Sequence, residues 1–170
     1  LGVRPGDLEA EHMLLDLYPK LNMNAEAVAH ADDVLARKPD DVKALKAKTK
    51  ALIQKGMQQD NKSLADAVAA GEKLNAIAPL DLEGQLLTQY ALVATKRPAD
   101  EIVSRARELL KAHPDDPRFE LVVASAYLYA NQPAEARQWL NTAASRKAPD
   151  QDFVGELMAR MDALGMFGQS

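Results

Sequence analysis

The stretch that decides the fold is residues 118–149, which read RFELVVASAYLYANQPAEARQWLNTAASRKAP. Residues 118–130 are apolar at most positions, and apolar residues recur every three to four positions from 134 to 146, which is the spacing of one helix face. Asn131 marks a turn between the two runs, and Pro149 follows the second run, where it would end a helix. The stretch therefore predicts a pair of helices joined by a short loop.

The same punctuation recurs along the chain. Pro39, Pro79, Pro114 and Pro149 are 40, 35 and 35 residues apart, a period typical of helical repeats. Each proline follows a run with helical periodicity and is soon followed by an Asp that can accept hydrogen bonds from the next helix. We therefore expect four helix pairs, in repeats at about 8–41, 42–81, 82–116 and 117–150. The expected helices are 8–20, 25–37, 42–56, 64–77, 82–95, 100–112, 118–130 and 134–146.

A ninth apolar run at 151–164 has no partner run after it. It is typical of the helix that caps a repeat array, because the last repeat would otherwise leave an apolar face in water. One face of this run carries Val154, Leu157, Met158, Met161 and Leu164.

Alanine is in excess, at 30 of 170 residues. It is the best helix former, and its small side chain lets helices approach closely. We expect Ala27, Ala67, Ala124 and Ala136 to lie at or near helix crossings. The sequence thus predicts an all-α protein, with one domain over residues 1–170.

The helix pairs resemble tetratricopeptide repeats, whose unit is about 34 residues. The fourth pair follows the family order of large, small and aromatic residues at Val123, Ala124, Tyr127, Asn131, Ala136, Leu140, Ala143 and Pro149. The first pair does so at Leu14, Leu15, Tyr18, Asn22, Ala27, Ala31, Val34 and Pro39. The resemblance implies a right-handed α–α superhelix of about four helix pairs plus a C-terminal capping helix. It also implies that the chain binds other proteins and is similar to helical-repeat proteins of bacteria.

The two middle repeats depart from the family pattern. In the second repeat, Gly56 stands where the family glycine ends the first helix, but about six extra residues lengthen the loop after it. In the third repeat, the Leu-Leu-Tyr spacing of the first pair recurs at Leu86, Leu87 and Tyr90. The sequence leaves the register of both repeats open.

Composition disfavours several classes of function. The chain has no Cys, so no disulfide, thiolate nucleophile or Cys-ligated metal is expected. His12, His30 and His113 lack any metal-ligand spacing, and structural roles are expected for all three. We therefore expect a non-catalytic protein without cofactor or metal.

Net charge and hydropathy indicate which kinds of partner and which location to expect for the chain. A net charge of −4 speaks against nucleic acid. No apolar run approaches the roughly 20 residues that span a bilayer, so a soluble protein is expected, in the cytoplasm or the periplasm. The chain begins with Leu1, which suggests a processed piece of a longer protein.

Charge is segregated within the chain. Residues 1–41 hold nine acidic and four basic residues, whereas residues 42–56 hold five lysines and no acid. Lys43, Lys46 and Lys50 are spaced i, i+3, i+7 and share one helix face. In the family that the chain resembles, the first helix of each pair lines a concave groove. The resemblance therefore makes these lysines a binding strip for an acidic segment of a protein or peptide partner, with a solvated lysine face as the alternative.

The matching groove positions of the fourth repeat are Arg118, Ser125 and Tyr129, by the same alignment. A cation and an amphipathic ring are a common combination at recognition surfaces. The terminal-carboxylate clamp of some tetratricopeptide co-chaperones is disfavoured, because His12 and Asp16 stand where it has Lys and Asn. The alternative function is a structural or assembly element that forms homo-oligomers or docks within a larger complex, with Met161 and Phe167 as candidate contacts.

Overall fold

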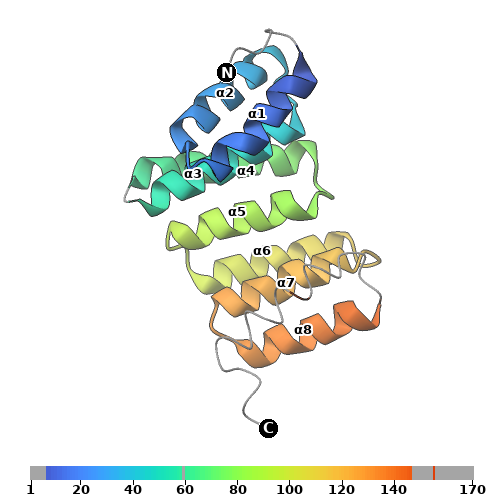
Figure 1. The fold of residues 1–170 in the computed structure, drawn as a ribbon. Coiled ribbons are helices and arrows are strands. Elements are labelled where there is room, and N and C mark those ends of the chain that lie inside the picture. The colour runs from blue at the N-terminus through green and yellow to red at the C-terminus, as the bar shows by residue number, and fades with distance from the viewer. Residues whose placement is uncertain (1–6, 59, 147–154, 156–170) are drawn as a thin grey trace. The chain divides into compact units, whose positions relative to one another are not determined.

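The computed structural model describes residues 7–58, 60–146 and Gly155. In these residues it contains eight α-helices and no strand (Figure 1). The helices are α1 (Leu8–Lys20), α2 (Asn24–Arg37), α3 (Val42–Met57), α4 (Asn61–Ile77), α5 (Leu82–Ala94), α6 (Ala99–Ala112), α7 (Arg118–Tyr129) and α8 (Pro133–Ser145).

The eight helices expected from 8 to 146 are confirmed, with ends within three residues of the prediction. The largest difference is at α4, which begins at Asn61 because the Asp60 carboxylate accepts a hydrogen bond from the backbone N–H of Ser63 at 3.2 Å. The ninth expected helix, 151–164, lies outside the described residues, as do Met161 and Phe167.

The aspartates that follow the prolines cap the next helices, as expected. Asp41 accepts from the backbone N–H of Ala44 at 2.9 Å, and Asp81 accepts from that of Gly84 at 2.7 Å. These bonds satisfy N–H groups that have no partner within the helix. Asp116 instead accepts from the backbone N–H of Arg118, at 3.0 Å, because Pro117 directly precedes α7.

The turns after α1, α5 and α7 share one backbone conformation. Asn22, Lys96 and Asn131 have φ of 58°, 58° and 56°, in the left-handed region. The residues four positions before them are Tyr18, Leu92 and Tyr127, of which Leu92 and Tyr127 are 5% and 8% exposed and Tyr18 is half-buried. The third repeat is therefore in register with Leu92, and the Leu-Leu-Tyr spacing at 86, 87 and 90 is two residues out of register.

Burial agrees with this register. Thr88 and Gln89 are buried, whereas Leu86, Leu87 and Tyr90 are only half-buried. The interior between α4 and α5 therefore contains a polar contact, Asn75 donating to the Thr88 hydroxyl at 3.0 Å, beside an apolar cluster that includes Ala67 and Ala91.

Gly56 has a different role from the one expected. It lies inside α3, which continues to Met57. A Cβ atom at Gly56 would overlap the side chain of Leu64 in α4. Glycine is therefore needed here because α3 and α4 approach closely, and it does not end the helix.

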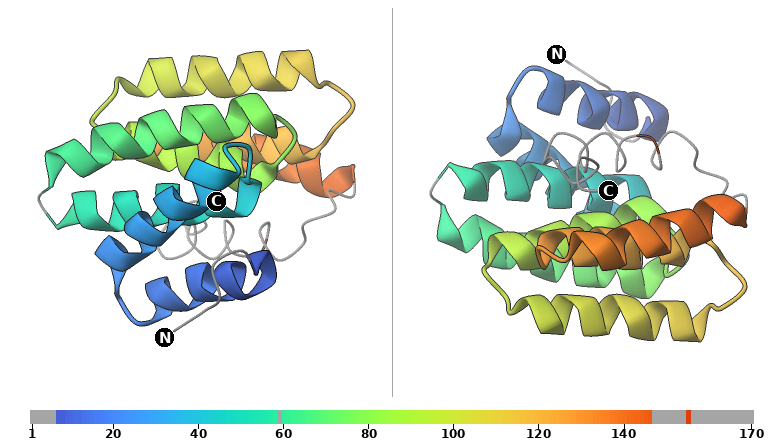
Figure 2. Two further views of the ribbon diagram at one scale, coloured as in Figure 1. Left: turned by 90° about the horizontal axis from the view of Figure 1, so that it is seen from above. Right: turned by 90° about the horizontal axis from the view of Figure 1, so that it is seen from below.

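The chain falls into two compact units, residues 1–96 and 97–170. In the first unit, α1 packs on α2 and α3 packs on α4, and the latter two run side by side in both views of Figure 2. The first helices of successive pairs also contact each other, α1 with α3 and α3 with α5. The prediction of one domain over 1–170 stays a prediction.

Several alanines are fully buried between the helices. Ala27, Ala44 and Ala67 are 0% exposed in the first unit, as are Ala124 and Ala136 in the second. The small side chain lets neighbouring helix backbones approach without leaving voids. In the second unit, α7 contacts both α6 and α8 and is buried at every residue from Phe119 to Tyr127.

Candidate functional site

The three lysines of the expected strip line a common cleft in the first unit. The cleft has a volume of about 680 Å³ and is formed by α1, α3 and the start of α5. Its lining residues are Leu15, Asp16, Pro19, Lys20, Val42, Lys43, Lys46, Ala47, Lys50 and Glu83. The i, i+3, i+7 spacing along α3 thus places Lys43, Lys46 and Lys50 along one wall of one hollow.

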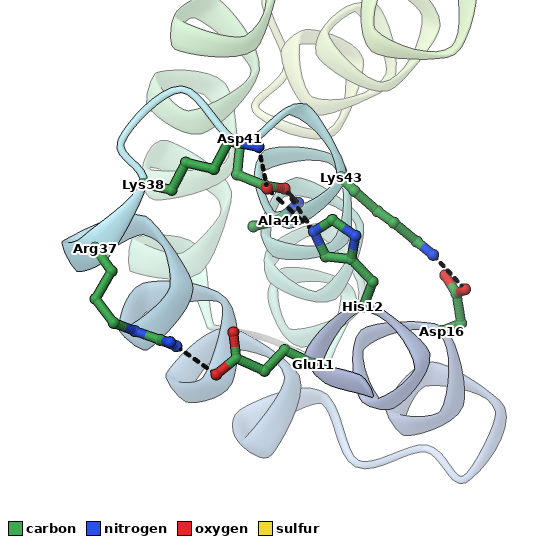
Figure 3. Close-up of polar contacts among 8 residues, drawn as sticks. All are labelled: Glu11, His12, Asp16, Arg37, Lys38, Asp41, Lys43 and Ala44. Atoms are coloured by element: carbon green, nitrogen blue, oxygen red, sulfur yellow. Dashed lines mark hydrogen bonds and ion pairs between the residues drawn. The ribbon is translucent and has the colours of Figure 1, made fainter. Parts of the chain in front are cut away.

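Each of these lysines is paired with a carboxylate of a neighbouring helix or its cap. Lys43 lies 2.8 Å from Asp16 of α1 (Figure 3). Lys50 lies 3.2 Å from Glu83 of α5. These pairs could not be predicted from the sequence, because the carboxylates come from the repeat before and the repeat after α3.

Lys46 is the most enclosed of the three. It lies 2.7 Å from Asp81 and 3.2 Å from Glu83, and its side chain is 23% exposed. Burial alone would lower the pKa of Lys46, but the hydrogen bonds to Asp81 and Glu83 outweigh it and raise that pKa. Since Asp81 caps α5, Lys46 ties α3 to the start of the next repeat.

The pairs at the rim are more open to solvent. Lys43 and Asp16 are 43% and 58% exposed, and Lys50 and Glu83 are 47% and 51% exposed. Burial would raise the pKa of Glu83, but the hydrogen bonds and charges of Lys46 and Lys50 lower it, so that carboxylate is ionised at neutral pH. Exposed ion pairs of this kind contribute only about 0–1 kcal/mol each. The Lys43–Asp16 and Lys50–Glu83 pairs therefore contribute little to the stability of the fold.

A buried carboxylate fixes the start of the lysine helix. Asp41, 2% exposed, receives the Ala44 N–H and has Nε2 of His12 3.0 Å from its Oδ1 and Nζ of Lys38 3.3 Å from its Oδ2 (Figure 3). An ionised carboxylate only accepts hydrogen bonds, so the His12 Nε2–H is the donor. Burial would raise the pKa of Asp41, but these hydrogen bonds outweigh it and lower the pKa. The structural role expected for His12 is thus to hold α1 against the first turn of α3.

The remaining histidines contact aromatic rings. His30 meets Tyr18 edge to face with ring centroids 5.8 Å apart, and His113 stacks on Phe119 at 4.8 Å.

Within 7–58, 60–146 and 155, no cluster of three or more His, Cys, Asp or Glu side chains could hold a metal ion. None of the helices in that part of the chain combines the length and the apolar character needed to cross a bilayer.

The candidate residues of the fourth repeat lie on α7, in the second unit. Arg118 is paired with Asp116 at 2.5 Å, and this contact is the main cause of the lowered pKa of Asp116. Ser125 is 5% exposed, whereas Tyr129 is half-buried. Of the three, Arg118 and Tyr129 are thus the more accessible to a partner. Their role in binding stays a prediction.

Comparison with known proteins shows the fold. No family model and no curated protein matches the chain. Among solved structures, it is similar to TTC0263, a thermophilic TPR protein in Thermus thermophilus, with a TM-score of 0.71 and 19% identity over 92% of this chain and 82% of the other. It is also similar to MamA MSR-1, with a TM-score of 0.54 and 18% identity over 94% of this chain and 82% of that one. These likenesses, with the helix pairs, confirm the all-α fold of a tetratricopeptide-like helical repeat.

Proposed function

We propose that this chain, which has a tetratricopeptide-like fold, is a non-catalytic binding module that holds a segment of a partner protein in the cleft of its first unit. The observation that carries the proposal is the cleft itself, where Lys43, Lys46 and Lys50 of α3 line one hollow together with apolar residues. Repeat folds of this kind serve protein interaction and scaffolding in general, through extended surfaces between repeats.

Apolar contact supplies the affinity. Pro19 of α1 and Val42 and Ala47 of α3 are half-buried and line the same cleft as the lysines. An apolar side chain of the partner that covers them removes apolar surface from water. This contribution depends little on salt.

The lysines supply orientation. Lys43 and Lys50 are half-exposed and held only by exposed carboxylates, so their ammonium groups can turn to a carboxylate of the partner. Lys20 adds a further exposed cation at the end of α1. The favoured partner is therefore a segment that combines an apolar anchor with acidic residues, and salt weakens its binding.

Peptides selected from a random library on the immobilised chain test this proposal. We expect the selected peptides to combine an acidic with an apolar residue. The double variant Lys43→Glu, Lys50→Glu should bind them about tenfold more weakly than the parent chain at low salt. At high salt the difference in affinity between the two chains should be smaller. Titration calorimetry measures both affinities, and circular dichroism shows that the variant is folded.

Lys62→Glu is the matched control. It makes one of the two charge reversals at an exposed position on the first turn of α4, outside the cleft lining. It should leave the affinity unchanged. Equal affinities of the double variant and the parent chain at both salt concentrations would disprove the cleft as the site.

A further inference from the structure

The outer face of α1 carries an exposed apolar stripe. Met13, Leu17 and Leu21 are 67%, 36% and 54% exposed. They follow each other at intervals of four residues and so lie along one side of the helix and its C-cap. Exposed apolar residues that line up in this way, unlike scattered ones, mark a surface for association.

The packing of α1 leaves this stripe on its outer side. Towards α2, Glu11 receives a hydrogen bond from Arg37 at 2.7 Å and Tyr18 meets His30. Towards α3, His12 contacts Asp41, while Asp16 pairs with Lys43 in the cleft. Among the described helices, α1 contacts only α2 and α3. The stripe points away from both.

Two exposed charges border the stripe. Glu9 and Lys20 are eleven residues apart on α1, so they lie almost in line along the helix axis, one near each end of the stripe. When two copies of α1 lie antiparallel about a two-fold axis near residue 15, Met13 of one copy meets Leu17 of the other. In the same register, Lys20 of each copy lies beside Glu9 of the other.

We infer that the outer face of α1 binds a second copy of this chain, as an isologous and antiparallel contact between two α1 helices. The face is self-complementary: Met13 of each copy meets Leu17 of the other, and each Glu9–Lys20 contact occurs twice because of the two-fold axis. The stripe itself shares no residue with the lysine cleft, and of its border only Lys20 also lines that cleft. Lys43, Lys46 and Lys50 therefore stay accessible to a partner when two copies associate.

Sedimentation velocity over a concentration series tests the contact on the full chain. We expect a monomer–dimer equilibrium that Met13→Glu weakens at least about tenfold, because it buries a charge against Leu17 of the second copy. Met57→Glu is the matched control, since Met57 is 63% exposed on another helix. It should leave the equilibrium unchanged.

A charge swap tests the antiparallel register. Lys20→Glu should weaken the dimer, because it places two carboxylates side by side at both ends of the contact. The double variant Glu9→Lys, Lys20→Glu should restore it. A chain that is monomeric at every concentration would overturn the inference, as would a dimer indifferent to Met13→Glu or a double variant no stronger than Lys20→Glu.

The variant of the lysine cleft separates dimerisation from partner binding. Lys43→Glu with Lys50→Glu should leave dimerisation unchanged, so the failure of one proposal is distinguishable from the failure of the other.

Discussion

At the scale of single residues, Asp41 does most to set the position of the lysine helix. Its buried carboxylate caps α3 through Ala44, and His12 of α1 and Lys38 of the preceding loop both reach it. An aspartate cap at this position could be predicted from the proline and aspartate punctuation. The His12 contact could not, because its partner is 29 residues away and meets it only once α1 packs against α3.

Replacing Asp41 by Asn keeps a capping oxygen but removes the charge that His12 and Lys38 surround. We expect the Asp41→Asn variant to be less stable than the parent by about 2 kcal/mol at pH 7, the worth of a hydrogen bond to a charged group. The folded pKa of Asp41 is lowered, so its stabilising effect is fully present above the unfolded pKa of about 4 and is lost as the pH falls through the folded pKa. Urea unfolding at several pH values should show the difference shrinking below about pH 4. A difference that stays constant down to pH 3 would contradict this account.

At the scale of helices and turns, periodicity located every described helix because each presents an apolar face for at least three turns. The register of the third repeat could not be predicted, since two signals compete there. Leu86, Leu87 and Tyr90 imitate the first pair, while the left-handed turn at Lys96 aligns the repeat two residues later. A turn conformation leaves a clear trace in sequence when Asn or Gly occupies it, and Lys at this position concealed it.

The occurrence of Lys at one of these left-handed turn positions and Asn at the others predicts opposite effects for two substitutions. Asn tolerates the left-handed region better than Lys does, so Lys96→Asn should raise the free energy of unfolding by about 0.5–1 kcal/mol and Asn22→Lys should lower it by a similar amount. Both side chains are exposed, so Lys96→Asn acts through the backbone, while Asn22→Lys also removes the hydrogen bond that Asn22 accepts from Asn24 at 3.3 Å. Denaturant unfolding measures the change in the free energy of unfolding for each variant. If both changes shift stability in the same direction, turn strain is not the cause.

At the scale of the whole chain, the net charge of −4 conceals an arrangement that runs from repeat to repeat. The basic α3 meets Asp16 of the repeat before it, Asp81 at the N-cap of α5, and Glu83 of the repeat after it. Charge counting predicted the lysine strip, and the structure places its members in one cleft. The internal neutralisation could not be predicted, because Glu83 is 33 residues beyond Lys50 and becomes its neighbour only through the contact of α3 with α5.

This arrangement makes the chain's own carboxylates competitors of the proposed partner. Glu83→Gln removes one competitor and leaves Lys50 free, so an acidic peptide should bind more tightly by up to about fivefold, because an exposed ion pair contributes at most about 1 kcal/mol. Glu101→Gln is the matched control. Glu101 is 49% exposed in a comparable pair with Arg97, and Glu83 is 51% exposed. Calorimetry at low salt should show tighter binding for Glu83→Gln alone, and a second change, Lys50→Gln, should abolish the gain. Unchanged or weaker binding by Glu83→Gln would mean that the internal pair stays closed when the partner binds, and that Lys50 is a structural residue and no part of the recognition surface.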